Sequence, residues 1–112
     1  MRPSAGASRL AKAAPVFAAL GDETRIALVA RLCGGGPQSI ARLTTGSAVT
    51  RQAITRHLDV LAGAGLVHDL WRGRERIWQL DTGRLAEAVR YLDQISKGWD
   101  EALARLKKFV EE

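Results

Sequence analysis

Residues 50–61, TRQAITRHLDVL, carry the pattern that decides the fold of this chain. Thr50 belongs to the residue types that begin helices, because a threonine hydroxyl accepts a hydrogen bond from a backbone N–H group of the first turn. Ile54, Leu58 and Leu61 then recur at the three- and four-residue spacing of one helix face. The segment predicts an amphipathic helix that opens at Thr50 and buries this apolar row.

The opposite face of that helix is polar and basic. Gln52, Thr55, Arg56 and Asp59 follow the same helical spacing, and Arg51 joins them at the amino end. Arginine and glutamine can make paired hydrogen bonds to purine edges in the major groove of DNA. A polar helix face is more often solvated surface, so its interpretation depends on the elements around it.

The preceding segment supplies the missing context. Residues 39–44 predict a short helix that buries Ile40 and Leu43, and a Gly-Ser pair then predicts a turn. Two short helices joined by a turn, the second with a basic amino end, are typical of a helix-turn-helix. This unit spans about residues 38–62, and it favours the polar face as a DNA-reading surface.

Two groups of residues in this unit are candidates for contact with double-stranded DNA. At the start of the short helix, the backbone N–H groups of Gln38 and Ser39 can bind a phosphate. In the recognition helix, Arg51 and Gln52 are the candidates for base contacts because they lie nearest its amino end. The full set on that helix is Thr50, Arg51, Gln52, Ala53, Thr55 and Arg56.

A β-hairpin is expected next. Residues 66–71 and 76–80 are short runs rich in branched and aromatic side chains. Between them Gly73 stands where a tight turn needs a positive φ. The hairpin, about residues 66–80, would form the wing of a winged helix-turn-helix. Its candidate contacts to phosphates or to the minor groove are Arg72, Arg74 and Arg76.

Two helices are expected before the helix-turn-helix. Apolar residues at helical spacing up to Leu20 predict the first, after a flexible arm of residues 1–8. Asp22 is an N-cap candidate for the second, whose buried row is expected to include Ile26 and Cys33.

The last segment, about residues 82–110, predicts a long helix with an apolar stripe. Leu85, Leu92, Trp99 and Leu106 repeat every seven residues, the spacing of a seam between packed helices. The stripe is longer than a domain of this size can cover, so we expect a homodimer in which a second copy covers it. The first helix is expected to flank the seam. The candidate interface residues are Phe17, Leu20, Leu85, Val89, Leu92, Ile95, Trp99, Leu103 and Leu106.

Composition sets further limits. With 112 residues, 46% of them hydrophobic, the chain predicts one domain over residues 9–112, mostly α with a β-hairpin wing. The net charge is +5, and residues 38–78 carry six arginines against three acidic residues, which favours a polyanion as partner. No apolar run reaches the ~18–20 residues that span a membrane. The single Cys33 fits a reducing cytoplasm.

A few single residues are of types that often have functional roles, and a structural role is favoured for each of them. His57 is expected to pack in the core and bond to backbone, and Cys33 to be buried and inert, with a redox role left open. Trp71 and Trp78 are expected to pack across the hairpin. The sequence has no catalytic triad pattern, carboxylate pair or phosphate-binding loop, so we expect no catalytic residues and no enzyme.

Two stretches resemble the ArsR-type family of bacterial winged helix-turn-helix regulators. Residues 19–25, ALGDETR, are similar to the family's ALADPTR entry into its second helix. Residues 50–58, followed by AGLV at 64–67, are similar to the family pattern SQPxVSxHLxxLxxAGLV, with threonine and glutamine in place of the usual serine and proline. The resemblance covers roughly residues 13–112 and implies a small dimeric repressor.

The family's metal chemistry does not carry over. Metal-sensing relatives have a CVC cysteine pair on the third helix, where this chain has Ile-Ala-Arg-Leu at 40–43, or Asp and His ligands on the last helix, which here has no histidine. Cys33, His57 and His68 are the only soft ligands, and their spacing does not bring them together. We expect no metal and no other cofactor, and the effector ligand stays unknown.

We therefore expect a cytoplasmic repressor that occupies an imperfect palindrome as a homodimer and makes no membrane contact. An activator, a repressor released by a ligand, or a metal-responsive repressor are alternatives. So is a protein-interaction module whose basic surface binds an acidic protein. A fold in which the apolar stripe packs back on its own core also stays open.

Overall fold

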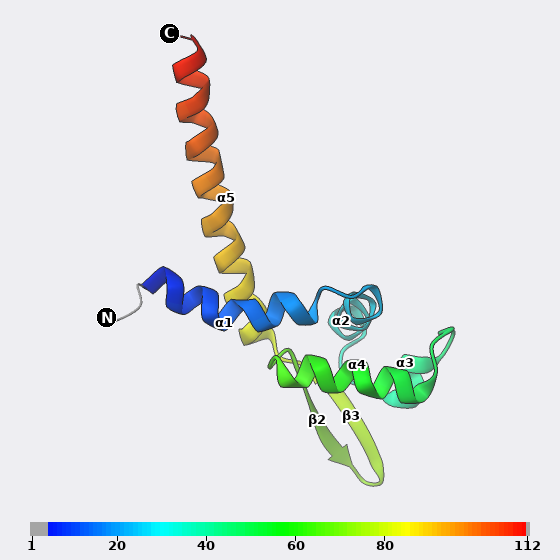
Figure 1. The fold of residues 1–112 in the computed structure, drawn as a ribbon. Coiled ribbons are helices and arrows are strands. Elements are labelled where there is room, and N and C mark those ends of the chain that lie inside the picture. Colours follow the sequence, from blue (N-terminus) through cyan, green and yellow to red (C-terminus); the bar gives the residue numbers. More distant parts are fainter. Residues whose placement is uncertain (1–4, 112) are drawn as a thin grey trace.

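The computed structural model describes the backbone of residues 5–111 and the side chains of residues 11–111. Within this range the predicted fold class is confirmed, since the chain is mostly helical with a β-hairpin wing (Figure 1). None of the described helices is long and apolar enough to cross a membrane. In chain order the elements are α1 (Ala5–Ala19), α2 (Glu23–Gly35), β1 (Gln38–Ser39), α3 (Ile40–Thr44), α4 (Arg51–Gly63), β2 (Val67–Arg72), β3 (Glu75–Leu80) and α5 (Thr82–Glu111).

Three helices begin at a polar side chain that accepts a backbone hydrogen bond. Asp22 accepts from the N–H of Arg25 at 3.0 Å, which confirms it as the N-cap of α2. Thr50 accepts from the N–H of Ala53 at 3.2 Å and opens α4 at the predicted residue. Ser39 caps α3 in the same way. These caps fix where each helix of the helix-turn-helix starts.

The core lies between α1, α2, α3, α4 and the sheet, and α5 adds Ala88 to it. Ile54, Leu58 and Leu61 of α4 are all buried, as their spacing predicts. In α2 the predicted row is wrong, because Leu28 and Leu32 face the core while Ile26 is 53% exposed and Cys33 is exposed. Apolar residues occur all round α2, so spacing alone did not decide which face is buried.

The sheet has one strand that the sequence did not predict. Its order is β1-β3-β2, with antiparallel neighbours and with Gln38 of β1 opposite Trp78 of β3. Gly73 has φ +65° at the tip of the β2–β3 hairpin, as expected. Both tryptophans were expected to pack across the hairpin, and this is wrong for Trp71. Trp78 is buried opposite Asp69, whereas Trp71 is paired with Arg76 near the tip and is 67% exposed.

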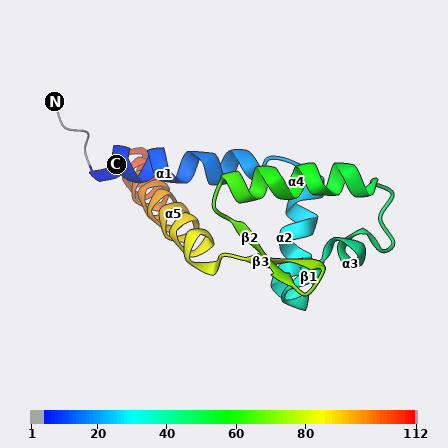
Figure 2. The same ribbon diagram turned by 90° about the horizontal axis from the view of Figure 1, so that it is seen from below.

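The molecule is elongated, with extents of 66 × 36 × 20 Å. In Figure 1 the wing points down and α5 projects upward, well beyond the rest of the fold. Figure 2 shows α1 and α5 at one end of the molecule and the helix-turn-helix with the sheet at the other. Residues 1–4 of the expected arm lie outside the described residues, and α1 already begins at Ala5. Among the described helices, α1 is the main neighbour of α5, where the rings of Phe17 and Tyr91 lie 6.3 Å apart.

Candidate nucleic-acid interface

The amino end of α4 presents long polar side chains to solvent. Arg51, Gln52 and Arg56 are exposed, and the described side chains give none of them a hydrogen-bond or ion-pair partner. Thr50 and Thr55 differ, because their hydroxyl groups already bond to the helix backbone, Thr55 by donating to the carbonyl oxygen of Arg51 at 3.0 Å. The arginine and glutamine side chains are therefore the groups at this end of α4 that are available to bind another molecule.

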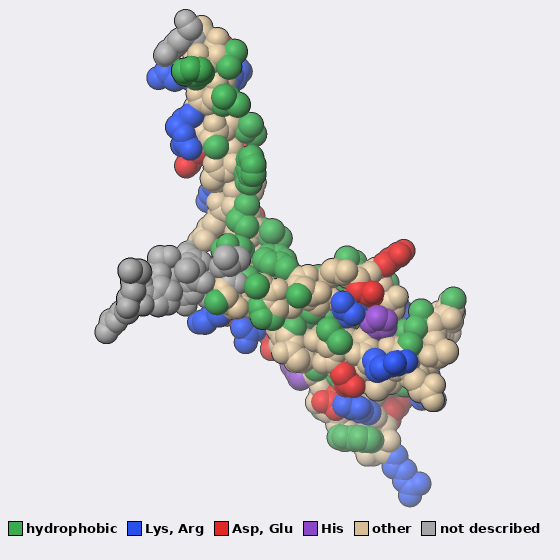
Figure 3. Space-filling model, in the orientation of Figure 1, with side chains coloured by type: hydrophobic (Ala, Val, Ile, Leu, Met, Phe, Trp, Pro, Cys, Tyr) green, Lys and Arg blue, Asp and Glu red, His purple; other side chains and the backbone are tan. Residues whose placement is uncertain are grey.

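The wing presents arginines of two kinds. Arg72 and Arg74 are exposed at either side of the Gly73 turn. Arg76 is held in place instead, since its Nε donates a hydrogen bond to Asp69 at 2.5 Å. Figure 3 shows Lys and Arg side chains projecting from the tip of the wing. A charge at such a tip can reach a phosphate that the body of the domain does not touch.

A hollow of about 360 Å³ joins the helices to the wing. Arg51 and Thr55 of α4 line one side, and Trp71, Arg74 and Arg76 of the wing line the other. Trp71 is the site residue that the sequence reasoning missed. Strand alternation puts residues 67, 69 and 71 on one sheet face, and because Val67 on that face is buried, alternation did not indicate that Trp71 is exposed.

The other two predicted contacts, Gln38 and Ser39, lie in β1 and not in a helix. Gln38 is 7% exposed, and its Nε2 donates to the carbonyl oxygen of Arg31 at 2.9 Å. Its side chain therefore faces α2 and ties β1 to it. Ser39 is half-buried and lines the hollow at the start of α3.

Known proteins share this sequence and architecture. A family profile described as "Helix-turn-helix domain" matches residues 20–69. The HTH-type transcriptional regulator Rv2034 of Mycobacterium tuberculosis is 38% identical over 93 residues, which are 83% of this chain and 83% of that protein. An ArsR-like transcriptional regulator from Rhodococcus sp. RHA1 is 40% identical, covers 88% of this chain and 92% of its own, and superposes with a TM-score of 0.76.

The chain belongs to the ArsR family of transcription regulators. It is accordingly a DNA-binding regulator. A homodimeric winged helix-turn-helix domain from Mycobacterium bovis, also described as a possible member of the family, has the same fold at 19% identity, with a TM-score of 0.64.

In this ArsR-family chain, the turn between α3 and α4 is held by an arginine of α2. Arg31 donates to the carbonyl oxygens of Leu43 at 2.7 Å and Arg42 at 2.8 Å, and more weakly to that of Thr45 at 3.4 Å. These carbonyls belong to the last turn of α3, where helical partners run out. One guanidinium group thus fixes the angle at which α3 gives way to the recognition helix.

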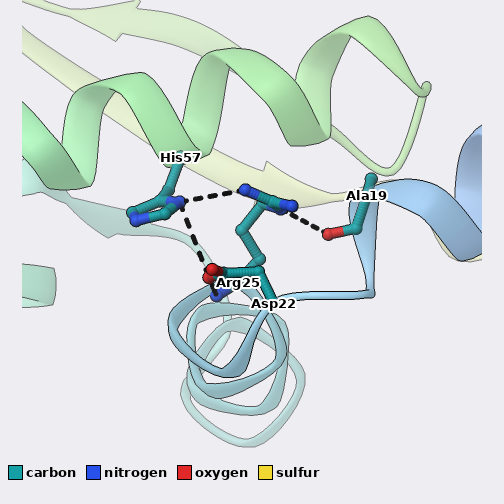
Figure 4. A network of polar contacts seen from close by, with 4 residues as sticks. All are labelled: Ala19, Asp22, Arg25 and His57. Carbon is teal, nitrogen blue, oxygen red and sulfur yellow. Dashed lines mark hydrogen bonds and ion pairs between the residues drawn. The ribbon is translucent and has the colours of Figure 1, made fainter.

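A second polar network ties α4 to the start of α2 (Figure 4). His57 Nδ1 lies 3.3 Å from a terminal nitrogen of Arg25 and 3.7 Å from a carboxylate oxygen of Asp22. Arg25 Nε also donates to the carbonyl oxygen of Ala19 at the end of α1. The expected bonds of His57 to backbone are wrong, because its described partners are side chains. The hydrogen bond from the backbone N–H of Arg25, followed by the charge of its guanidinium group, lowers the pKa of Asp22.

The described residues hold no group of three or more His, Cys, Asp or Glu side chains placed for a metal ion. The absence of a metal cofactor stays a prediction.

Proposed function

We propose that the chain is a cytoplasmic repressor that binds an imperfect palindrome in double-stranded DNA as a homodimer. The observation that carries the proposal is the shared hollow, in which Arg51 of α4 faces the same space as Arg74 of the wing. A recognition helix in the major groove and a wing beside it would contact one half-site together. Repression then follows from occupancy, because a bound dimer blocks polymerase.

Direct reading of bases is assigned to Arg51 and Gln52. Both are exposed at the amino end of α4, the end that contacts base edges when such a helix enters the major groove. Arg56 lies one turn further along and is assigned to the phosphates. Ala53 and Thr55 contribute shape more than hydrogen bonds, since the Thr55 hydroxyl already donates its hydrogen to the helix. The Thr50 hydroxyl only accepts there, so its O–H stays free to donate to a phosphate.

The wing and β1 are assigned to the backbone of the DNA. Arg72 and Arg74 are exposed next to the turn, and Arg76 remains 38% exposed despite its bond to Asp69. The backbone N–H groups at Gln38 and Ser39 are the weakest part of the assignment, because Gln38 is buried in the sheet. Contacts of this kind set register and affinity and carry little sequence information.

Homodimerisation is assigned to the exposed stripe of α5. Val89, Leu92, Trp99, Leu103 and Leu106 are all exposed in the single chain, with Trp99 at 65%. A large apolar stripe left on a soluble helix needs a covering partner. A second copy fits because the rows repeat every seven residues, which suits a helix-helix seam. The homodimeric domain from Mycobacterium bovis, which has the same fold, supports a second copy of the chain as the partner that covers the stripe.

The flanks of that seam are already partly covered. Phe17, Leu20 and Leu85 are half-buried and pack against the core of their own chain, so we expect them at the edge of the dimer contact. Ile95 continues the exposed stripe. Two linked half-site contacts bind far more tightly than one, which gives a regulator this small the affinity it needs.

The test is a selection of duplexes from a random pool with the purified protein, followed by anisotropy titrations of the selected sequence and its variants. We expect two half-sites ~10–10.5 base pairs apart, or a multiple of that spacing. Arg51→Ala and Gln52→Ala should each lose ~1–3 kcal/mol at one base position per half-site. Arg74→Ala should weaken all duplexes alike and reduce the salt slope by about one per subunit.

Arg105→Ala, near the carboxyl end of α5 and outside the hollow, is the matched control and should change neither the base preference nor the salt slope. If both helix variants keep the wild-type ranking of duplexes, the reading face is misassigned. A wild-type protein that selects no sequence and shows a shallow salt dependence would instead favour the protein-interaction module.

A further inference from the structure

A second hollow, of about 330 Å³, lies between α1 and α5, away from the DNA-facing side. Its volume falls at the low end of the ~300–1,000 Å³ range of small-molecule sites. Ala13 and Val16 of α1 and Ala88 of α5 give it an apolar floor, and all three are buried. Tyr91 adds an aromatic wall. The floor suits the hydrocarbon or ring portion of a small molecule.

The rim of this hollow is cationic. Lys12, Arg84 and Arg90 lie on it, against one carboxylate, Glu87. Arg84 and Glu87 approach one another to 3.7 Å and largely offset each other. Among the ion pairs of residues 11–111, none involves Lys12 or Arg90. The site therefore keeps two positive charges over an apolar floor, which selects for an anion with an apolar body.

The hollow is separate from the proposed dimer seam. At 3.6 residues per turn, the rim residues Arg90 and Gln94 point more than about 120° around α5 from the stripe that contains Leu92 and Trp99, whereas Ala88 of the floor lies only about 40° from Leu92 and is buried in its own chain. In Figure 3 hydrophobic side chains run along one edge of α5, and Figure 1 shows α1 crossing the lower part of that helix. A second copy seated on the stripe would thus leave the hollow accessible.

The walls of the hollow belong to the two helices that set the dimer geometry. Tyr91 also contacts Phe17, with ring centroids 6.3 Å apart, so a group wedged beside Tyr91 would press on the packing of α1 against α5. A shift there changes how the body of each subunit sits relative to α5. Because the two recognition helices must match one operator spacing, such a shift changes DNA affinity.

We propose that this hollow is an effector site for a small organic anion, whose carboxylate binds Lys12 and Arg90 and whose apolar body covers Ala13, Val16 and Tyr91. Binding itself is independent of the function proposed above, while its effect on DNA affinity rests on that function.

Calorimetry on the full chain tests the binding with three probes: benzoate, octanoate and inorganic phosphate. We expect at least one carboxylate to bind once per chain with a Kd below about 1 mM, and phosphate to bind about tenfold more weakly or not at all. Lys12→Gln and Arg90→Gln should each weaken that binding about fivefold or more, and Arg105→Gln should leave it unchanged. Circular dichroism checks that each variant keeps its helix content.

The proposal is wrong if neither carboxylate binds, if phosphate binds as well as the carboxylates, or if Arg90→Gln and Arg105→Gln bind alike. For regulation, the selected duplex is titrated with and without the bound carboxylate. We expect about a threefold or larger change in DNA affinity for wild type and Arg105→Gln, and none for Arg90→Gln. Unchanged DNA affinity overturns the effector role, whereas a protein that binds no DNA contradicts the proposed function and leaves calorimetry to decide on the site.

Discussion

The guanidinium group of Arg76 lies over the indole ring of Trp78, with its Cζ atom 4.5 Å from the ring centroid. The same group donates from Nε to the carboxylate of Asp69 on the neighbouring strand. A planar cation stacked on a buried ring and bonded to a carboxylate is fixed in orientation. Arg76 thus stiffens the wing next to its tip, whereas Arg72 and Arg74 at the turn are exposed.

This arrangement predicts a pH dependence at Asp69. The hydrogen bond from Arg76, followed by its charge, lowers the pKa of Asp69 below the ordinary 3.8. Because the folded pKa is below the unfolded one, the bond stabilises the wing above the ordinary value and is lost as pH falls through the folded pKa. Carboxyl NMR titration should show the low pKa in the wild type. Arg76→Gln should raise it toward 3.8, and Arg74→Gln should not; equal effects of both would contradict the assignment.

The exposed Trp71 predicts an apolar contribution to DNA binding. It lies beside Arg74 in the hollow shared with α4, where a ring can pack on sugar or on a thymine methyl group. Trp71→Ala should therefore lower duplex affinity about three- to tenfold, and Trp71→Phe should lower it less. Ile26→Ala, another exposed apolar truncation but on α2, is the control. A Trp99→Phe background keeps Trp71 and the buried Trp78, and its fluorescence should change on adding DNA. The change should disappear when Trp71→Phe is added, and an equal change in both proteins would exclude the contact.

The sequence predicted those elements whose signals are local. Thr50 and the row from Ile54 to Leu61 lie within one helix, so capping and spacing sufficed to place α4 and its outer face. Gly73 marked the wing turn in the same way. Strand β1 has two residues and exists because Gln38 pairs with Trp78, forty positions away. No local pattern encodes such a pairing.

The candidate site shows the same division. The exposed arginines of α4 and the wing were found because residue type and helical face are local properties. The polar partners inside the domain were not predicted from the sequence. Arg76 and Asp69, like His57 and Asp22, become neighbours only through tertiary packing. The exposure of Trp71 depends likewise on where the core ends, because Val67 and Trp78 on the same sheet face are buried while Trp71 lies near the tip of the wing.

Arg31 is predicted to hold the helix-turn-helix together. Its guanidinium bonds to the carbonyl oxygens of Arg42 and Leu43 at 2.8 and 2.7 Å, and Arg31→Met keeps the aliphatic stem but removes these donors. We expect a loss of about 1–3 kcal/mol in the free energy of unfolding by urea. Arg42→Met removes a charge from an exposed side chain and should cost less than about 0.5 kcal/mol. Equal losses of unfolding free energy in the two variants would show that the hydrogen bonds of Arg31 do not stabilise the fold.

The last prediction concerns assembly, and it follows from the length of α5. Its 30 residues form a rod of ~45 Å at 1.5 Å per residue, and α5 runs clear of the rest of the fold in Figure 1. The alternative in which the stripe packs back on its own core does not describe this chain. The side chains of Leu92, Trp99 and Leu106 are 49%, 65% and 58% exposed. That surface needs a partner, and a second α5 offers matching rows.

We therefore expect a dimer at micromolar concentration. Leu92→Glu puts a charge into the seam and should give a folded monomer, since Leu92 contributes little to the core of its own chain. Lys97→Glu changes the charge on the exposed face of α5 opposite the stripe and should stay dimeric. Light scattering gives the mass, circular dichroism the helix content, and anisotropy the affinity for the selected duplex, which should fall by about a hundredfold in the monomer because linked half-sites no longer bind together. A monomeric wild type, or a Leu92→Glu monomer that binds the duplex as tightly as wild type, would rule out the dimer mechanism.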